Sequence, residues 1–150
     1  LGEKLASPLI EKGHVDVMLA FEKLEACRHV DLLRPEGVVV VNDQSIAPLS
    51  VTSGSDRYPT DEEVRGILKQ RTNRIFFVDG PGLTAEKLGN RRAANIILLG
   101  FLSPLLPLET DHWRCGLERS VRPAFLELNL KAFELGMQEA AKHSILSSPA

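Results

Sequence analysis

The sequence predicts a three-layer α/β protein, in which a mainly parallel sheet is flanked by helices and the C-terminal half is rich in helix. Short apolar runs at 15–20, 38–41 and 74–80 have the composition of buried strands. Segments with helical periodicity separate them, which is the arrangement of a parallel sheet with right-handed crossovers. From about Thr84 onward the apolar spacing is helical throughout. We expect the 150 residues to form a single domain.

The first strand and helix are expected between Gly13 and Val30. The apolar run VDVMLA at 15–20 is typical of a strand buried on both faces. The next ten residues predict a short amphipathic helix, because apolar and charged positions alternate at helical spacing. The residues expected on its buried face are Phe21, Leu24 and Cys27.

The central strand and the helix after it have stronger signals. Val38–Val41 are four consecutive β-branched residues behind a proline–glycine turn, and such runs favour the middle of a sheet. Thr60 and Glu63 have the spacing of a capping box, so we expect a helix to begin there. Its expected buried stripe is Val64, Ile67 and Leu68. The run at 74–80 then predicts a third strand that ends in a turn.

Two longer helices are expected in the second half. Residues 91–102 are apolar almost all round, which predicts a buried helix with Asn90 as its N-cap. Residues 122–142 predict another helix, with one face formed by Phe125, Leu128, Ala132 and Leu135. Gly136 lowers helix propensity there, so we expect it to mark a close packing contact.

Composition excludes several classes of function. The formal net charge of −2 and pI near 6.1 give no general attraction to nucleic acid or to an anionic membrane. No apolar run approaches the roughly 20 residues that span a bilayer. Cys27 and Cys115 form no CxxC pair, so we expect no iron–sulfur or zinc site from this chain alone, and a reduced, cytoplasmic protein.

No catalytic constellation is visible either. The four histidines lack metal-ligand spacing, and the serines lack a GxSxG elbow. The segment VDGPGL at 78–83 lacks the lysine of a phosphate-binding loop, so a turn at the end of a strand is the expectation. We therefore predict no catalytic residue and no metal ligand in this chain.

The polar segment after the central strand is the strongest candidate for ligand contact. Open α/β sheets bind ligands beyond the carboxyl ends of their strands, where the amides of Asn42 and Gln44 are expected. Ser7 is a further candidate for lining the same cleft. Loop-tying by these short polar side chains is the alternative.

Arg91 and Arg92 stand at the expected start of an apolar helix, where the helix dipole disfavours cations by about 0.3–1 kcal/mol each. We consider three explanations for them: an anion ligand, an interface with a partner chain, or surface charges that are exposed or paired locally with Glu86. Asn95 has apolar neighbours on both sides, so its amide is expected to need an internal partner or a subunit contact.

Four segments in order resemble the gamma-domain family of 2-oxoacid:acceptor (pyruvate/indolepyruvate ferredoxin) oxidoreductases, with the indolepyruvate branch most similar. They are SPLIEKGHVDVMLAFEKLEA at 7–26, VVVVNDQSIAP at 38–48, AEKLGNRRAANIILLG at 85–100 and ELNLKAFELG at 127–136. The resemblance extends over essentially the whole chain. Each segment alone is a weak signal, but four in register are specific for the family.

The resemblance implies a subunit that carries no cofactor itself. Members convert a 2-oxoacid and coenzyme A to an acyl-CoA and carbon dioxide and pass two electrons to ferredoxin. Thiamine diphosphate and iron–sulfur clusters serve this reaction from a large partner subunit. The gamma domain packs against the thiamine-binding parts, on the coenzyme A side of the cleft. The contribution expected of Asn42, Gln44 and Ser7 is on that side.

One family feature is missing from the sequence. Members begin with a glycine-rich GxGGQG turn from strand to helix, and the 150 residues contain none. Because the chain opens on Leu1, we expect that segment to precede it. Two alternatives remain: a non-catalytic α/β module that binds a ligand or scaffolds a complex, and a flavodoxin-like domain, which the helix-rich second half disfavours.

Overall fold

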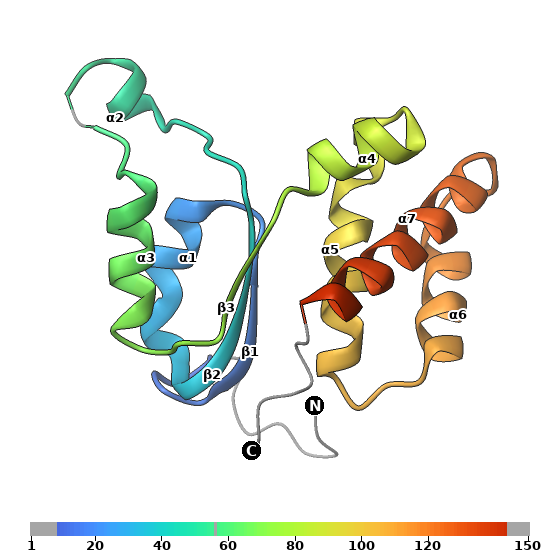
Figure 1. The fold of residues 1–150 in the computed structure, drawn as a ribbon, viewed down its shortest axis with the longest axis horizontal. Helices are drawn as coiled ribbons and strands as arrows, with labels where there is room; N and C mark the ends of the chain where they lie inside the picture. The colour runs from blue at the N-terminus through green and yellow to red at the C-terminus, as the bar shows by residue number, and fades with distance from the viewer. Residues whose placement is uncertain (1–8, 56, 144–150) are drawn as a thin grey trace. The chain divides into compact units, whose positions relative to one another are not determined.

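The computed structural model describes residues 9–55 and 57–143 (Figure 1). According to which residues lie close together in space, the chain divides into two compact units, Leu1–Phe77 and Val78–Ala150. The first unit contains nearly all of the sheet, and the second is built from helices. A mainly parallel sheet flanked by helices, followed by a helix-rich C-terminal half, was the fold class predicted from the sequence, and it is confirmed.

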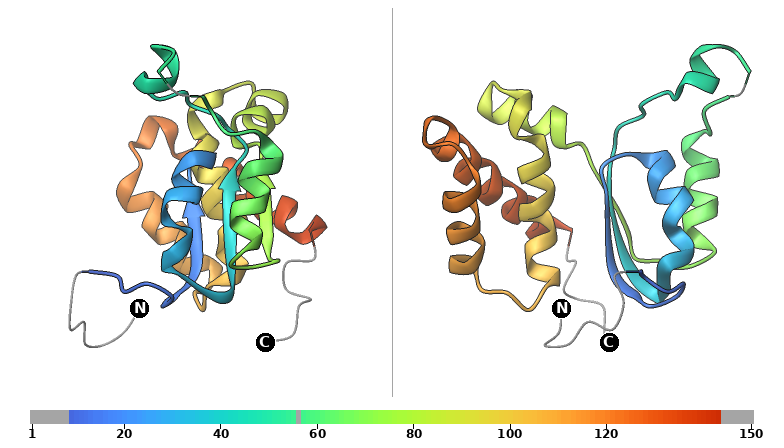
Figure 2. Two further views of the ribbon diagram at one scale, coloured as in Figure 1. Left: turned by 90° about the vertical axis from the view of Figure 1, so that its left-hand side faces the viewer. Right: turned by 180° about the vertical axis from the view of Figure 1, so that it is seen from behind.

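The sheet has three strands in the order β1-β2-β3, so the middle strand of the chain is also the middle strand of the sheet. The strands are β1 (Val15–Ala20), β2 (Leu33–Asn42) and β3 (Ile75–Val78). The crossovers carry α1 (Lys23–His29) and α3 (Asp61–Lys69), which cover the same face of the sheet (Figures 1 and 2). A 3-10 turn at Val30–Leu32 leads from α1 into β2.

The core of the first unit lies between this face of the sheet and the two helices. Its buried apolar residues are Ala20, Ala26, Leu33, Val39, Val41, Val64 and Leu68. All of Val38–Val41 are buried, as expected for a central strand. Because parallel strands end at the same edge of a sheet, this core fixes the positions of the loops that follow β1 and β2.

The strand β2 is longer than the predicted run of valines, because the expected proline–glycine turn is a bulge within it. Val15 pairs with Leu33, whereas Val17, two residues on, pairs with Val38. Glu36 accommodates the extra residues with a φ of 57°, in the left-handed region.

The prediction for the buried face of α1 is only partly correct, since Cys27 is partly buried against the core whereas Phe21 is exposed. The helix begins only after Glu22, which caps it, so Phe21 lies outside the helix and its side chain is 47% exposed. The buried residues of α1 are Lys23 and Ala26. Apolar spacing misplaced Phe21 because it took this residue for a helical position.

The capping box at the start of α3 is confirmed. The hydroxyl of Thr60 accepts the N–H of Glu63 at 3.3 Å, and a carboxylate oxygen of Glu63 accepts the N–H of Thr60 at 2.8 Å. The hydrogen bond from Arg57, followed by that from the Thr60 backbone, lowers the pKa of Glu63 to about 2. The cap therefore stays ionised well below neutral pH.

We expect Thr60→Ala to lower the free energy of unfolding by about 1 kcal/mol, because one orphan N–H of α3 loses its acceptor. Urea unfolding followed by circular dichroism measures this. The matched control is Thr110→Ala, since Thr110 also stands at the start of a helix but makes no capping hydrogen bond. Equal losses in the two variants would contradict the assigned cap.

The second unit is built around two helices that cross closely, α5 (Ala94–Leu102) and α7 (Pro123–Lys142) (Figure 1). Its elements are α4 (Gly80–Leu88), a 3-10 turn (Arg91–Ala93), α5 (Ala94–Leu102), a 3-10 turn (Ser103–Leu105), α6 (Thr110–Ser120) and α7 (Pro123–Lys142). An added Cβ on Gly136 of α7 would lie 2.1 Å from the carbonyl oxygen of Ile97 in α5. The predicted close contact at Gly136 is therefore confirmed.

The predicted face of α7 is only partly correct. Phe125 is 45% exposed, whereas the buried residues of this helix are Ala132, Phe133, Gly136 and Ala140. The buried side of α7 combines the small residues Ala132, Gly136 and Ala140 with the large Phe133. The predicted face shares only Ala132 with that side.

Candidate functional site

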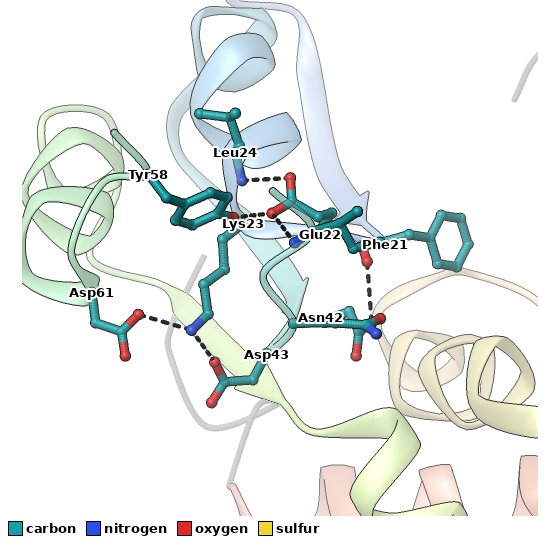
Figure 3. A network of polar contacts seen from close by, with 10 residues as sticks. Phe21, Glu22, Lys23, Leu24, Asn42, Asp43, Tyr58 and Asp61 are labelled. Carbon is teal, nitrogen blue, oxygen red and sulfur yellow. Dashed lines mark hydrogen bonds and ion pairs between the residues drawn. The ribbon is translucent and has the colours of Figure 1, made fainter. Parts of the chain in front are cut away.

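A network of polar side chains lies at the edge of the first unit where β1 and β2 end (Figure 3). Three segments contribute to it: the start of α1, the turn that follows β2, and the start of α3. Its side chains are Glu22, Lys23, Asn42, Asp43, Gln44, Tyr58 and Asp61. We call this set the edge network.

Glu22 is the acceptor that gathers the most donors in the network. One carboxylate oxygen accepts the N–H groups of Leu24 at 2.9 Å and Glu25 at 3.2 Å, which caps α1. The other accepts the N–H of Ile46 at 3.3 Å and the hydroxyl of Tyr58. Glu22 is buried, so this carboxylate needs all of these donors to offset its desolvation.

Lys23 is a buried cation held between two carboxylates. Its Nζ lies 2.6 Å from Asp43 Oδ1 and 2.8 Å from Asp61 Oδ1 (Figure 3). Burial alone would lower the pKa of Lys23, but the hydrogen bonds and charges of the two aspartates outweigh burial and raise it above 10.5. The hydrogen bond from Lys23 also lowers the pKa of Asp61. The ammonium therefore stays protonated and is not a general base.

Asn42 and Gln44, the predicted cleft residues, are brought together in the edge network. The amide nitrogen of Asn42 donates to the carbonyl of Phe21 and to the side-chain oxygen of Gln44, both at 3.1 Å. Asn42 is buried, and this geometry ties the ends of two strands together. Gln44 is exposed and is the outer member of the pair. Contact with a ligand stays a prediction for both, and Ser7 lies outside the described residues.

Arg91 and Arg92 lie in the second unit, in the 3-10 turn that precedes α5. The side chain of Asn90 accepts the N–H of Arg92 at 2.9 Å and so caps this turn. The α-helix predicted to follow Asn90 directly begins only at Ala94, with Ala93 as its N-cap. Both arginines are exposed, and neither forms an ion pair with a carboxylate among the residues described. The alternative of pairing with Glu86 is not observed, since Glu86 pairs with Lys87 instead.

Asn95 is exposed on α5, which corrects the expectation of an amide enclosed by apolar neighbours. Its neighbours in sequence are apolar, but the helix directs them to another side. An exposed amide needs no internal partner, so only the predicted subunit contact remains for Asn95. That contact stays a prediction.

Two observations on the described residues concern metal binding and thiol reactivity. Among them, no group of three or more His, Cys, Asp or Glu side chains is placed to hold a metal ion. Burial, followed by the charge of Glu22, raises the pKa of the Cys27 thiol, which makes it a poor nucleophile. Within residues 9–55 and 57–143, no helix is long and apolar enough to cross a membrane.

Sequence reasoning missed Glu22, Lys23 and Tyr58. A glutamate next to a lysine at the start of a helix has the pattern of a solvated surface. The available signal was the position of Glu22 immediately before the helix, where acidic side chains accept helix N–H groups. Nothing in the local sequence pattern indicated that Lys23 would be buried between Asp43 and Asp61, which lie 20 and 38 positions further along the chain.

Fold and edge network together define the class: a parallel α/β protein that presents a polar edge at the carboxyl ends of its strands. A solved structure shares this fold, the gamma subunit of a keto/oxoacid ferredoxin oxidoreductase from Geobacter sulfurreducens. It superposes with a TM-score of 0.62 at 21% identity, over 87% of this chain and 66% of the other.

The relatives identify the family. The family model for pyruvate ferredoxin/flavodoxin oxidoreductase matches residues 2–139. The chain is 33% identical over 141 residues to indolepyruvate oxidoreductase subunit IorB of Pyrococcus horikoshii, covering 93% of this chain and 70% of the relative. It is 34% identical over 136 residues to the IorB subunit of Archaeoglobus fulgidus, covering 89% and 67%. The chain belongs to the pyruvate ferredoxin/flavodoxin oxidoreductase family, as the sequence predicted.

Proposed function

We propose that this chain is the small subunit of an indolepyruvate-type 2-oxoacid:ferredoxin oxidoreductase. The observation that carries the proposal is the family match over residues 2–139, together with relatives that are all subunits IorB. The reaction converts a 2-oxoacid and coenzyme A to an acyl-CoA and carbon dioxide, with two electrons passing to ferredoxin. The chain spans about two thirds of the length of the proteins it matches, at 66 to 70%.

A large partner subunit would supply the redox and decarboxylation chemistry through thiamine diphosphate and iron–sulfur clusters. This chain would provide a wall of the cleft and a surface that packs against the partner. Gln44, backed by Asn42, would offer amide contacts on the coenzyme A side. We place the complex in the cytoplasm, in agreement with the free thiols of Cys27 and Cys115.

The net negative charge of the edge network favours contact with an uncharged part of coenzyme A rather than with its phosphate groups. Asp43 and Asp61 are 42% and 70% exposed, and Glu22 adds a third negative charge against the single positive charge of Lys23. A surplus of negative charge repels phosphate groups. The amide-bearing arm of coenzyme A suits Gln44, since an amide side chain both donates and accepts hydrogen bonds.

Co-purification with the large subunit tests this proposal. The two chains from the same genome are co-expressed, and a tag on the large subunit should retain this chain in a fixed ratio. The complex is then assayed for coenzyme A-dependent viologen reduction with aryl and alkyl 2-oxoacids. Association without any such activity would favour the scaffolding alternative, and absence of association would contradict the proposal.

We expect the double change of Arg91 and Arg92 to glutamine to raise the Kd for the large subunit about tenfold, or about 1.4 kcal/mol. Arginines without local ion pairs at a helix start are disfavoured by the helix dipole, so a partner's carboxylates would compensate for that cost. The free energy of unfolding should not fall in this variant, because removal of the two cations relieves the dipole.

Titration calorimetry at low salt measures the Kd. The matched control changes Arg119 and Arg122, two further exposed arginines of the second unit, to glutamine. The control should leave the Kd within about twofold, as is usual for exposed charges away from an interface. An unchanged Kd for the Arg91/Arg92 variant would remove both residues from the interface.

A further inference from the structure

Lys23 reaches both segments that border the predicted cleft. It is the first residue of α1, and its Nζ contacts Asp43, directly after β2, and Asp61, the first residue of α3. Its backbone N–H also donates to the carbonyl of Gln44 at 3.3 Å. Main chain and side chain of one residue therefore hold the turn Asn42–Gln44 from two directions.

Because the side chain of Lys23 is buried, moving the turn Asn42–Gln44 away from its observed position is energetically costly. The side chain of Lys23 is 8% exposed, while its two carboxylate partners remain in contact with solvent. If the turn moved away, the ammonium would lose Asp43 and stay buried with a single partner, which is costly for a buried charge. The aspartates pay no comparable penalty when they separate, because water replaces the ammonium.

The first residue of the turn is fixed independently, because Asn42 is the buried last residue of β2 and its amide donates to the carbonyl of Phe21 and to the side chain of Gln44. The N–H of Gln44 donates to the carbonyl of Asn42 at 2.7 Å, which closes the turn locally. The N–H of Ile46 reaches Glu22, the residue before Lys23. Beyond that point the chain leaves the sheet toward the short helix α2 (Leu49–Thr52). The Glu22–Lys23 dipeptide is thus a second anchor beside Asn42, and it holds the residues after β2: Asp43, Gln44 and Ile46.

We propose that Lys23 is a positioning residue for coenzyme A binding: it holds the turn Asn42–Gln44 in its binding position through Asp43 and Asp61. This inference rests on the proposed function, which places Gln44 on the coenzyme A side. A turn that is already held in place does not have to become ordered when coenzyme A binds. Loss of the Lys23 contacts therefore lowers the fraction of molecules in which the turn has its binding position. Apparent affinity falls by the same factor, while the chemical step is unaffected.

Lys23→Met tests the proposal in the complete complex. Methionine keeps the length of the side chain and suits a buried site, and the aspartates can become hydrated, so the variant should fold. If the competent population falls to about one fifth, the KM for coenzyme A rises about fivefold with kcat little changed. Hydrogen exchange in the segment 43–48 should become faster in the same variant.

Two further sets of variants separate positioning from a general loss of structure. Asp43→Asn and Asp61→Asn each leave Lys23 one partner and should raise the KM by less than Lys23→Met does. Lys12→Met is the matched control, because Lys12 forms an exposed ion pair with Asp31 at 2.7 Å in the same unit. It should change neither the KM nor exchange in 43–48.

The outcomes distinguish this inference from the proposed function. An unchanged KM for coenzyme A in an active Lys23→Met complex overturns the inference alone, and so does a loss of kcat without a change in KM. Faster exchange in 43–48 with unchanged KM shows that Lys23 holds the turn but does not position it for coenzyme A. A wild-type complex without coenzyme A-dependent activity overturns the proposed function and this inference together.

Discussion

Gly136→Ala should lower the free energy of unfolding by about 3 kcal/mol, one of the two largest effects that the structure predicts. The added methyl group would lie 2.1 Å from the carbonyl oxygen of Ile97 and 2.8 Å from the backbone nitrogen of Phe101. Both are backbone atoms of α5, so no side-chain rotation relieves the overlap, and the helices have to separate. The helix propensity of alanine, worth about 1 kcal/mol, offsets only part of this cost.

Gly116→Ala is the matched control, since Gly116 also lies within a helix of the second unit but has no atom within 4 Å of an added Cβ. This variant should gain about 0.5–1 kcal/mol, because alanine replaces glycine in a helix without a clash. Gly100→Ala should resemble Gly136→Ala, as its Cβ would meet the carbonyl oxygen of Phe133 at 2.1 Å. Chemical unfolding that showed a gain for Gly136→Ala would contradict the close helix crossing.

Glu22→Gln should lower the free energy of unfolding by about 2–3 kcal/mol, which is the other large effect that the structure predicts. Each carboxylate oxygen of Glu22 accepts two donors, and glutamine replaces one of these oxygens with an NH₂ group. That group would face either the two N–H groups at the start of α1 or the donors of Ile46 and Tyr58. Two hydrogen bonds to a charged acceptor are then lost, and donors are left opposite a donor in a buried place. Urea unfolding followed by circular dichroism measures the loss.

The control for this change is Glu25→Gln on the same helix. Glu25 is 47% exposed and pairs with Arg28 and His29 at the surface, so its loss should cost less than about 1 kcal/mol. Tyr58→Phe removes only the hydroxyl and should cost about 1 kcal/mol. Combined with Glu22→Gln, it should add less than its separate effect, because both changes break the same contact. Full additivity would argue against the Glu22–Tyr58 bond.

The elements best predicted from the sequence are those with local causes. Consecutive β-branched residues identified β2, the Thr60–Glu63 spacing identified the start of α3, and Asn90 was recognised as a cap. Each of these depends on residues within a few positions of one another. The close contact at Gly136 was also predictable, because a glycine inside a long helix costs stability unless a neighbour needs the space.

The predictions that failed depended on contacts between distant segments. The buried faces of α1 and α7 were assigned from apolar spacing, but Phe21 and Phe125 are exposed, whereas Lys23 and Phe133 are buried. The edge network joins Lys23 to Asp61, which is 38 positions away. A charged residue that is buried only because of such a distant partner cannot be told from a surface charge in the sequence alone.

Reconstitution from separate subunits tests most directly whether this chain is a functional subunit of a 2-oxoacid oxidoreductase. The purified chain is titrated into the large subunit, and coenzyme A-dependent viologen reduction with indolepyruvate is followed. We predict little activity from either subunit alone, and a rate that rises with added chain and saturates at a fixed ratio. Full activity of the large subunit alone, unchanged by the addition of this chain, would contradict the proposed function.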